Sequence, residues 1–294
     1  MNLIATVLEV VSPVFILAAI GFVWVKAGYE YRLNFVTTLS MTLGVPALIF
    51  VSLMETELET SAISSLLMAS VVGYAVLTVV IWAGVKLFRK DTSLLVAPLI
   101  FGNTGNLGLP LALFAFGETG LAYAVVVFAV MAIWSFTFGV WLVSGGGSVL
   151  KAFKEPMVWA TLLGALFMWQ GWETPTFVTN TLRLLGQIAI PLMLITLGVA
   201  VARLSPGRMG TAFVLSGVKL LLCVGIAYGV GVYFQLAPIA LAVLVIQIAT
   251  PVAVTSYLLA EKYGRNAEQV AGLVVASTLL SVGYLPLLIG FLLP

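Results

Sequence analysis

The chain has 294 residues, 62% of them hydrophobic and only 8% charged, with a net charge of +2 and a mean hydropathy of +1.19. This composition offers too little polar surface to cover a soluble globule, so it predicts an integral membrane protein in contact with lipid, with no nucleic acid as a partner. The chain has no histidine and a single cysteine, Cys223. That excludes zinc sites, Cys–His catalysis and disulfides within the chain.

Taken in chain order, apolar runs of about 20 residues, the length that crosses a bilayer as a helix, predict an all-α fold with ten transmembrane spans. The spans are predicted at residues 3–25, 34–54, 62–88, 93–116, 120–143, 157–172, 177–202, 211–234, 237–260 and 267–293. No basic residue precedes the first run, which is therefore expected to be the first span and not a cleavable signal peptide.

Charged residues in the connections predict the orientation. Basic residues follow the odd-numbered spans: Lys26, Arg32, Lys86, Arg89, Lys90, Lys151, Lys154, Arg203, Arg208, Lys262 and Arg265. The connections after even-numbered spans contain no lysine or arginine, and carry Glu55, Glu57, Glu59, Glu118 and Glu173. Because positive loops stay in the cytoplasm, both termini are expected on the non-cytoplasmic side.

Two pairs of matched positions indicate an internal repeat. Pro46 in LGVPALIFVSL and Pro191 in IAIPLMLITLG are 145 residues apart, and Phe116-Gly117 and Tyr263-Gly264 are 147 apart. Both separations are close to half the chain length. Residues 1–147 and 148–294 are therefore predicted to be two repeats, and five spans in each force the second copy to cross the membrane in the opposite direction.

The fourth predicted span is interrupted by the run FGNTGNLGLP at residues 101–110, which holds three glycines, two asparagines and a proline. A broken helix leaves backbone groups without partners in hydrocarbon, so it persists only where protein or a wet cavity surrounds it. We interpret the run as a binding site near the membrane midplane. The alternative is a tight helix crossing mediated by glycine, with a proline kink.

The repeat predicts a matching interruption in the ninth span, and QIATPVAVTS at residues 247–256 places a proline and polar side chains there. Thr250 is expected to cap a second half-helix with Pro251 in its first turn, and Pro110 to start its counterpart. Two helix N-termini converging on the midplane favour a carboxylate. The candidate binding residues are Asn103, Thr104, Gly105, Asn106, Gly108, Pro110, Gln247, Thr250, Pro251, Thr255 and Ser256.

Two basic residues inside predicted spans are candidate charge partners for an anion. Lys219 lies roughly 12 Å into the eighth span, and either faces a cavity or partner, or extends its ammonium to the cytoplasmic surface. Arg183 shares one helix face with Asn180 and Gln187, which borders either the substrate path or a polar seam at an interface.

No aspartate or glutamate falls at either interruption, which disfavours a proton antiporter with paired carboxylates. No metal site or cofactor is expected. The one cation considered is sodium, which carbonyls and hydroxyls around Asn106, Gln247 and Thr255 would hold.

The segments FGNTGNLGLPLALFAFG and ATPVAVTSYLLAEKYG resemble bacterial members of the auxin efflux carrier family, which includes the plant PIN carriers and bacterial malate and malonate permeases. The resemblance covers essentially the whole chain. It implies ten helices with crossed broken helices 4 and 9, as in sodium/bile-acid symporters, in a homodimer in the plasma membrane. It also implies a scaffold of spans 1, 2, 6 and 7, and a transport domain of spans 3–5 and 8–10 that moves as an elevator. The long hydrophilic loop of the plant carriers is absent, since only residues 144–156 separate spans five and six.

These observations favour a secondary transporter of small organic anions, either dicarboxylates such as malate and malonate or an auxin-like monocarboxylate. A passive anion channel is the alternative. An intramembrane enzyme is disfavoured because no nucleophile–base pair is evident, and Ser256 and Lys219 are candidates in name only.

Overall fold

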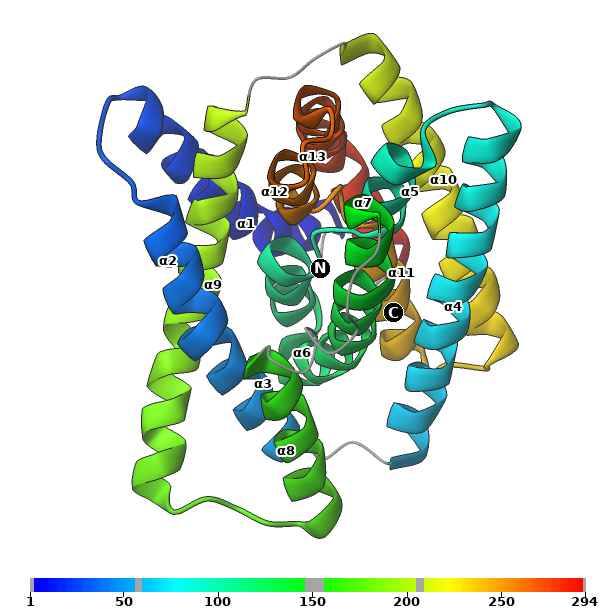
Figure 1. The fold of residues 1–294 in the computed structure, drawn as a ribbon. Helices are drawn as coiled ribbons and strands as arrows, with labels where there is room; N and C mark the ends of the chain where they lie inside the picture. The colour runs from blue at the N-terminus through cyan, green and yellow to red at the C-terminus, as the bar shows by residue number, and fades with distance from the viewer. Residues whose placement is uncertain (1–2, 56–59, 146–155, 205–208, 293–294) are drawn as a thin grey trace.

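The computed structural model describes residues 3–55, 60–145, 156–204 and 209–292, and these ranges are almost entirely helical, with no β-strand (Figure 1). Several charges used for the orientation, namely Glu57, Glu59, Lys151, Lys154 and Arg208, lie outside the described residues.

The described part of the first half of the chain forms four long helical stretches and one short helix, with three π-helical turns inside the longer stretches. The elements are α1 (Leu3–Lys26), α2 (Leu33–Leu39), η1 (Ser40–Gly44), α3 (Val45–Met54), α4 (Thr60–Leu87), α5 (Thr92–Ile100), η2 (Thr104–Gly108), α6 (Leu109–Trp134), η3 (Ser135–Gly139) and α7 (Val140–Ser144). The second half consists of α8 (Pro156–Gln170), α9 (Thr176–Arg203), α10 (Met209–Tyr233), α11 (Pro238–Ala249), α12 (Val254–Lys262) and α13 (Ala267–Leu292).

Among the described residues, six helical segments are long and apolar enough to cross a membrane. They are Leu33–Met54, Ser61–Leu87, Thr104–Ser144, Thr176–Arg203, Met209–Tyr233 and Ala267–Leu292. Val11–Lys26 and Pro238–Ala249 are shorter apolar helices. The chain is therefore built to pass through a bilayer several times.

The longest of these segments, Thr104–Ser144, is divided near its first third. Gly117 in α6 has φ 64° and ψ −156°, which is not helical backbone. A glycine takes this conformation at little cost because it has no Cβ. The division falls where the sequence predicts the connection between the fourth and fifth spans.

The helices form two groups that meet at α6. Figure 1 shows α2, α3, α8 and α9 on the left, and α4, α5 and α10 on the right. In the first group α1 packs along α9, and α3 packs on α8 and α9. In the second group α10 contacts α4, α11 and α13. The helix α6 contacts members of both groups, so a site beside it lies between them.

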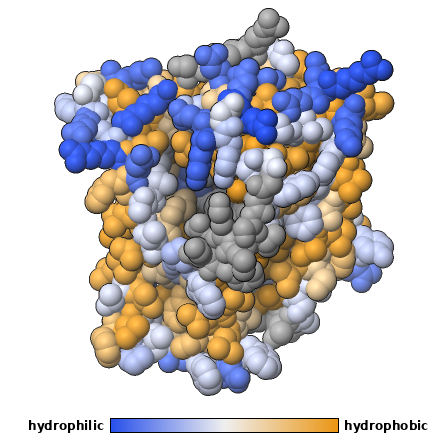
Figure 2. Space-filling model, in the orientation of Figure 1, coloured by the Kyte–Doolittle hydropathy of each residue, from blue (hydrophilic) through white to orange (hydrophobic). Residues whose placement is uncertain are grey.

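The exterior of the bundle is apolar, as a bilayer requires. Large aliphatic side chains such as Val79 (68% exposed), Leu221 (75%) and Leu287 (76%) point outward from α4, α10 and α13. Figure 2 shows hydrophobic residues over most of the visible face and hydrophilic residues gathered along its upper edge. Since water is unfavourable for such a surface, lipid is its natural solvent.

Candidate functional site

Two non-helical segments, residues 101–103 and residues 250–253, cross and pair inside the bundle. The Asn103 backbone N–H donates to the Pro251 carbonyl at 2.7 Å, and the Ala253 N–H donates to the Phe101 carbonyl at 3.2 Å. Gly102 and Val252 form an isolated antiparallel bridge between these bonds. The pairing gives partners to backbone groups that would otherwise be costly to bury away from water.

Glycine is needed for this close approach at two positions. A Cβ on Gly102 would lie 2.1 Å from Thr250 Oγ1 and 3.0 Å from the Thr250 carbonyl oxygen. A Cβ on Gly108 would lie 2.3 Å from Gln247 Oε1. The structure thus brings the glycine-rich run against the candidate residues of the second interruption. A larger side chain at Gly102 would press on the Thr250 backbone, and one at Gly108 would displace the Gln247 side chain.

Three polar side chains at the crossing are buried with atoms that lack a hydrogen-bond partner. Asn103 Nδ2, Thr104 Oγ1 and both amide atoms of Gln247 are unpartnered, although these residues are at most 5% exposed. A buried polar group without a partner costs about 1–3 kcal/mol. Buried polar groups in native proteins usually have a partner, so several unpartnered groups at one crossing require an explanation.

The end of α11 is held by three groups from neighbouring helices. The Lys219 ammonium of α10 donates to the Thr250 carbonyl at 2.9 Å, and the Tyr284 hydroxyl of α13 donates to the Ala249 carbonyl at 2.7 Å. The Val252 N–H donates to Ser277 Oγ at 2.9 Å. Lys219 is only 3% exposed, so the expectation that it extends to the cytoplasmic surface is wrong and the alternative, a buried partner, is correct.

Tyr284 and Ser277 were missed at the sequence level. They lie seven residues apart in α13 and so share one helix face. A polar pair at this spacing inside an apolar run is the signal that would have found them.

The predicted start of the half-helix at the second interruption is wrong. Thr250 does not cap the second helix: it closes α11, and its Oγ1 donates to the Gln247 carbonyl at 2.7 Å. The next helix, α12, begins at Val254 after Ala253, because residues 250–253 are used in the crossing. Extended backbone that pairs with another segment cannot also form a first helical turn.

Pro110 lies in the first turn of α6, as predicted, but helical backbone already precedes it. The helical backbone begins at Thr104 with the π turn η2, in which the Leu109 N–H donates to the Thr104 carbonyl. Proline in a helix interior clashes with the carbonyl four residues earlier, here that of Asn106. The wider π turn accommodates the ring, so Pro110 sits in the first turn of α6 without ending the helix.

The remaining candidates lie around the crossing but not all within it. Gly105 faces the ring of Phe128, and Asn106 is half-buried. Thr255 is exposed on α12, and no hydrogen bond within the described ranges links it to Asn106 or Gln247. The described residues contain no group of three or more His, Cys, Asp or Glu that could hold a metal ion, and a sodium site at Asn106, Gln247 and Thr255 stays a prediction.

Ser256 lies beside the crossing, next to Phe101, whereas Arg183 lies away from it. Ser256 is 7% exposed and lines a gap of about 10 Å³ with residues of α5 and η3, including Phe101 and Ser135. Arg183 donates to Glu55 at 2.6 Å and to Asn180 Oδ1 at 3.3 Å, at the other side of α6.

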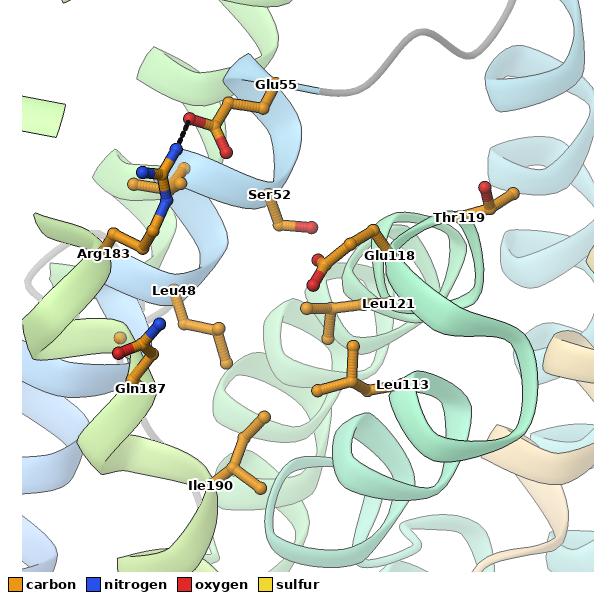
Figure 3. A pocket seen from close by; sticks show the side chains of 12 residues that line it. Leu48, Ser52, Glu55, Leu113, Glu118, Thr119, Leu121, Arg183, Gln187 and Ile190 are labelled. Atoms are coloured by element: carbon orange, nitrogen blue, oxygen red, sulfur yellow. Dashed lines mark hydrogen bonds and ion pairs between the residues drawn. The ribbon is translucent and has the colours of Figure 1, made fainter. Parts of the chain in front are cut away.

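Arg183 lines a cavity of about 510 Å³ between α3, α9 and α6. Figure 3 shows Arg183, Gln187 and Ile190 of α9 on one side and Leu113, Glu118 and Leu121 of α6 on the other, with Ser52 of α3 and Glu55, the residue after α3, between them. The polar face predicted on the seventh span therefore borders a cavity. Glu118 and Ser52 were not among the candidates, since isolated polar residues near span ends are usually hydrated.

Comparison with known proteins decides the family. Residues 6–147 and 140–289 match the model of the membrane transport protein family, and together they cover nearly the whole chain. The chain belongs to this family. The resemblance of the two interrupted segments to auxin efflux carriers is thereby confirmed.

Three relatives are similar in sequence to this chain, at moderate identity. An "Uncharacterized transporter" of Methanothermobacter thermautotrophicus is 29% identical over 95% of this chain and 96% of its own length. An "Uncharacterized transporter" of Methanocaldococcus jannaschii is 28% identical over 66% of this chain and 69% of its own. A "Putative malonate transporter" of Rhizobium meliloti is 25% identical over 85% of this chain and 84% of its own.

This membrane transport protein is thus a multi-pass membrane protein with relatives named as transporters. That agrees with the expectation that it is not an enzyme.

Proposed function

We propose that this transporter is a secondary carrier of small organic anions, with its substrate site where residues 101–103 cross residues 250–253. The observation that carries the proposal is the cluster of buried, unpartnered polar atoms on Asn103, Thr104 and Gln247 at that crossing. An amide nitrogen and a hydroxyl donate hydrogen bonds to a carboxylate, and an amide oxygen accepts one from a hydroxyl or from water.

Helix starts on both sides of the crossing favour negative charge. The helical backbone resumes at Thr104 after Asn103 and at Val254 after Ala253, and neither start has a side-chain cap. The first N–H groups of a helix have no partner within it and carry about half a positive charge in total. Lys219 adds a full positive charge at the second interruption, because its ammonium donates to the carbonyl of Thr250, two residues before Val252. No acidic side chain is buried among the described residues.

The element order fits ten spans in two inverted repeats, residues 1–147 and 148–294. In this assignment span four is α5, η2 and α6 up to Gly117, and span nine is α11 with α12. Each is interrupted once, at residues 101–103 and 250–253. Crossed broken spans near the midplane, one from each repeat, are how several secondary transporters build a site.

Alternating access follows from the two groups of helices. The proposed scaffold is α1–α3, α8 and α9, and the proposed transport domain is α4–α7 and α10–α13, which carries both interruptions. The cavity between α3, α9 and α6 separates the two groups near Glu55 and Glu118, on the predicted non-cytoplasmic side. An elevator motion of the transport domain along α9 would close this cavity and open the opposite side. We further propose a homodimer in the plasma membrane, with both termini outside.

The substrate class is mono- or dicarboxylate, auxin-like or like malate and malonate. Two features support it: the electropositive crossing, and the name of the Rhizobium meliloti relative, a "Putative malonate transporter".

The test is exchange of a radiolabelled carboxylate in proteoliposomes, over a panel that includes malonate, malate and indole-3-acetate. A carrier exchanges internal for external substrate and saturates, and unlabelled substrate inside accelerates uptake. Asn103→Ala is expected to abolish exchange, while Asn34→Ala, an exposed amide on α2, serves as the matched control. Uptake that neither saturates nor accelerates would identify a passive anion channel. No uptake of any carboxylate, or full exchange in Asn103→Ala, would refute the proposed site.

A further inference from the structure

Lys219 is the only charged side chain buried among the described residues. It lies ten residues after the start of α10, Met209, or about 15 Å along the helix, and therefore near the middle of a bilayer. The two ion pairs within the described part of the chain join Arg32 to Glu30 and Arg183 to Glu55, so neither involves this ammonium.

The partners of the ammonium are neutral. Its Nζ donates to the Thr250 carbonyl at 2.9 Å and to Cys223 Sγ at 3.6 Å. The carbonyl belongs to the residue that ends α11, and the C-terminal end of a helix carries about half a negative charge. This end stabilises the ammonium but leaves about half of its charge uncompensated.

The charge is attached to the site itself. Lys219 bonds to the backbone of the second interruption, whose next residue, Pro251, accepts from Asn103. The helix α10 also packs on α11 and α13. Any motion that carries the crossing therefore carries this charge. The equivalent position 145 residues earlier is Tyr74, which is neutral, so the other repeat adds no second cation.

We propose that the Lys219 ammonium compensates the charge of the substrate. The transport domain then crosses the membrane with a net charge equal to the charge of the bound substrate plus the one positive charge of Lys219. The inference rests on the proposed function, in which the transport domain, which contains the crossing, moves across the membrane. An empty carrier then carries one positive charge, a carrier loaded with a monocarboxylate carries none, and a carrier loaded with a dicarboxylate carries one negative charge.

The consequence is a specific dependence on membrane potential. One elementary charge that crosses the full field changes a rate ratio by about 50-fold per 100 mV. In wild-type protein, exchange of a monocarboxylate uses only the loaded, neutral body and should not respond to voltage. The voltage-dependent step is the return of the empty carrier, which exchange bypasses.

The experiment measures exchange of a radiolabelled carboxylate, present on both sides of proteoliposomes, at potentials of 0 and about −100 mV set with potassium and valinomycin. Wild type is compared with Lys219→Met, which removes the charge at similar length, and with Lys219→Arg, which keeps it. Lys86→Met is the matched control, because Lys86 is an exposed lysine at the end of α4. Indole-3-acetate is the monoanion probe and malonate the dianion probe.

The apparent valence is the charge that moves with the loaded carrier, obtained from the voltage dependence of the exchange rate. We expect it to differ by one unit between wild type and Lys219→Met. Monoanion exchange stays constant with voltage in wild type, Lys219→Arg and Lys86→Met, and slows several-fold at about −100 mV in Lys219→Met. Equal voltage dependence in wild type and Lys219→Met overturns the inference while leaving the carrier function intact. If wild type exchanges neither probe, the proposed function fails and the inference fails with it.

A loss of activity in Lys219→Met does not block the test, because wild type alone decides it. Its monoanion exchange must be constant with voltage while its dianion exchange slows. Should only one probe be exchanged, the apparent valence must be 0 for indole-3-acetate or −1 for malonate. A value of −1 or −2, respectively, overturns the inference.

Discussion

Replacing Gly102 with alanine tests the crossing directly, because the effect is steric and can be worked out from the structure. Gly102 does not have the positive φ that disfavours alanine, so its backbone tolerates the substitution. The new Cβ would lie 2.1 Å from Thr250 Oγ1 and 3.0 Å from the Thr250 carbonyl oxygen, whereas ordinary contact begins near 3.4 Å. The two segments must therefore separate by about 1 Å.

That separation lengthens the bonds that hold the crossing, from Asn103 N to Pro251 O at 2.7 Å and from Ala253 N to Phe101 O at 3.2 Å. Losing both buried bonds, with the strain of overpacking, destabilises the fold by about 3–6 kcal/mol. We expect a clearly lower unfolding midpoint in detergent and a loss of carboxylate exchange.

Two further variants make the measurement decisive. Gly229→Ala in α10 is the control, since a Cβ there meets no atom within 4 Å, and it should be neutral or slightly stabilising. In the double variant Gly102→Ala with Thr250→Ala, the closest clashing atom is gone, so the double variant should be more stable than the sum of the single effects predicts. An unchanged midpoint and normal exchange in Gly102→Ala would contradict the crossing geometry.

Three more substitutions separate binding from folding. Asn103→Ala should reduce exchange more than 10-fold and leave the unfolding midpoint unchanged, because Asn103 Nδ2 has no protein partner; a matching drop in both would show a structural role instead. Tyr284→Phe should lower stability by about 1–3 kcal/mol, measured as a lower unfolding midpoint, since the Ala249 carbonyl loses its 2.7 Å donor; a wild-type midpoint would mean that the bond contributes nothing. Arg183→Ala should change stability by less than about 1 kcal/mol, because its ion pair with Glu55 is 47% and 41% exposed, but should raise the substrate concentration for half-maximal uptake as the cavity loses its cation. An unchanged concentration dependence would remove Arg183 from the substrate path.

Much of the helical order could be predicted from the sequence, because apolar runs and breaker residues report directly on where helices lie in a bilayer. The non-helical residues 101–103 and 250–253 fall within the two runs singled out by glycine, asparagine and proline. The family, too, was evident from those two segments.

The residues at which the helices begin near the crossing could not all be predicted from the local sequence alone. Thr250 and Pro251 have the residue types of a helix N-terminus, and only the partner segment explains why they are extended instead. At Pro110 the local preference holds, since it lies in the first turn of α6, although the π turn η2 precedes it. Long-range pairing overrode local preference at Thr250 and Pro251.

The same pairing explains how one crossing can be both rigid and selective. Every backbone group named at the second interruption has a protein partner: Ala249 and Thr250 accept from Tyr284 and Lys219, Pro251 accepts from Asn103, and Val252 donates to Ser277. The backbone therefore needs no ligand to hold its shape. The unpartnered atoms belong to side chains, on Asn103, Thr104 and Gln247. Substitutions of the backbone partners should thus act on folding, and substitutions of these three side chains on binding, because the framework and the recognition groups are separate sets of atoms.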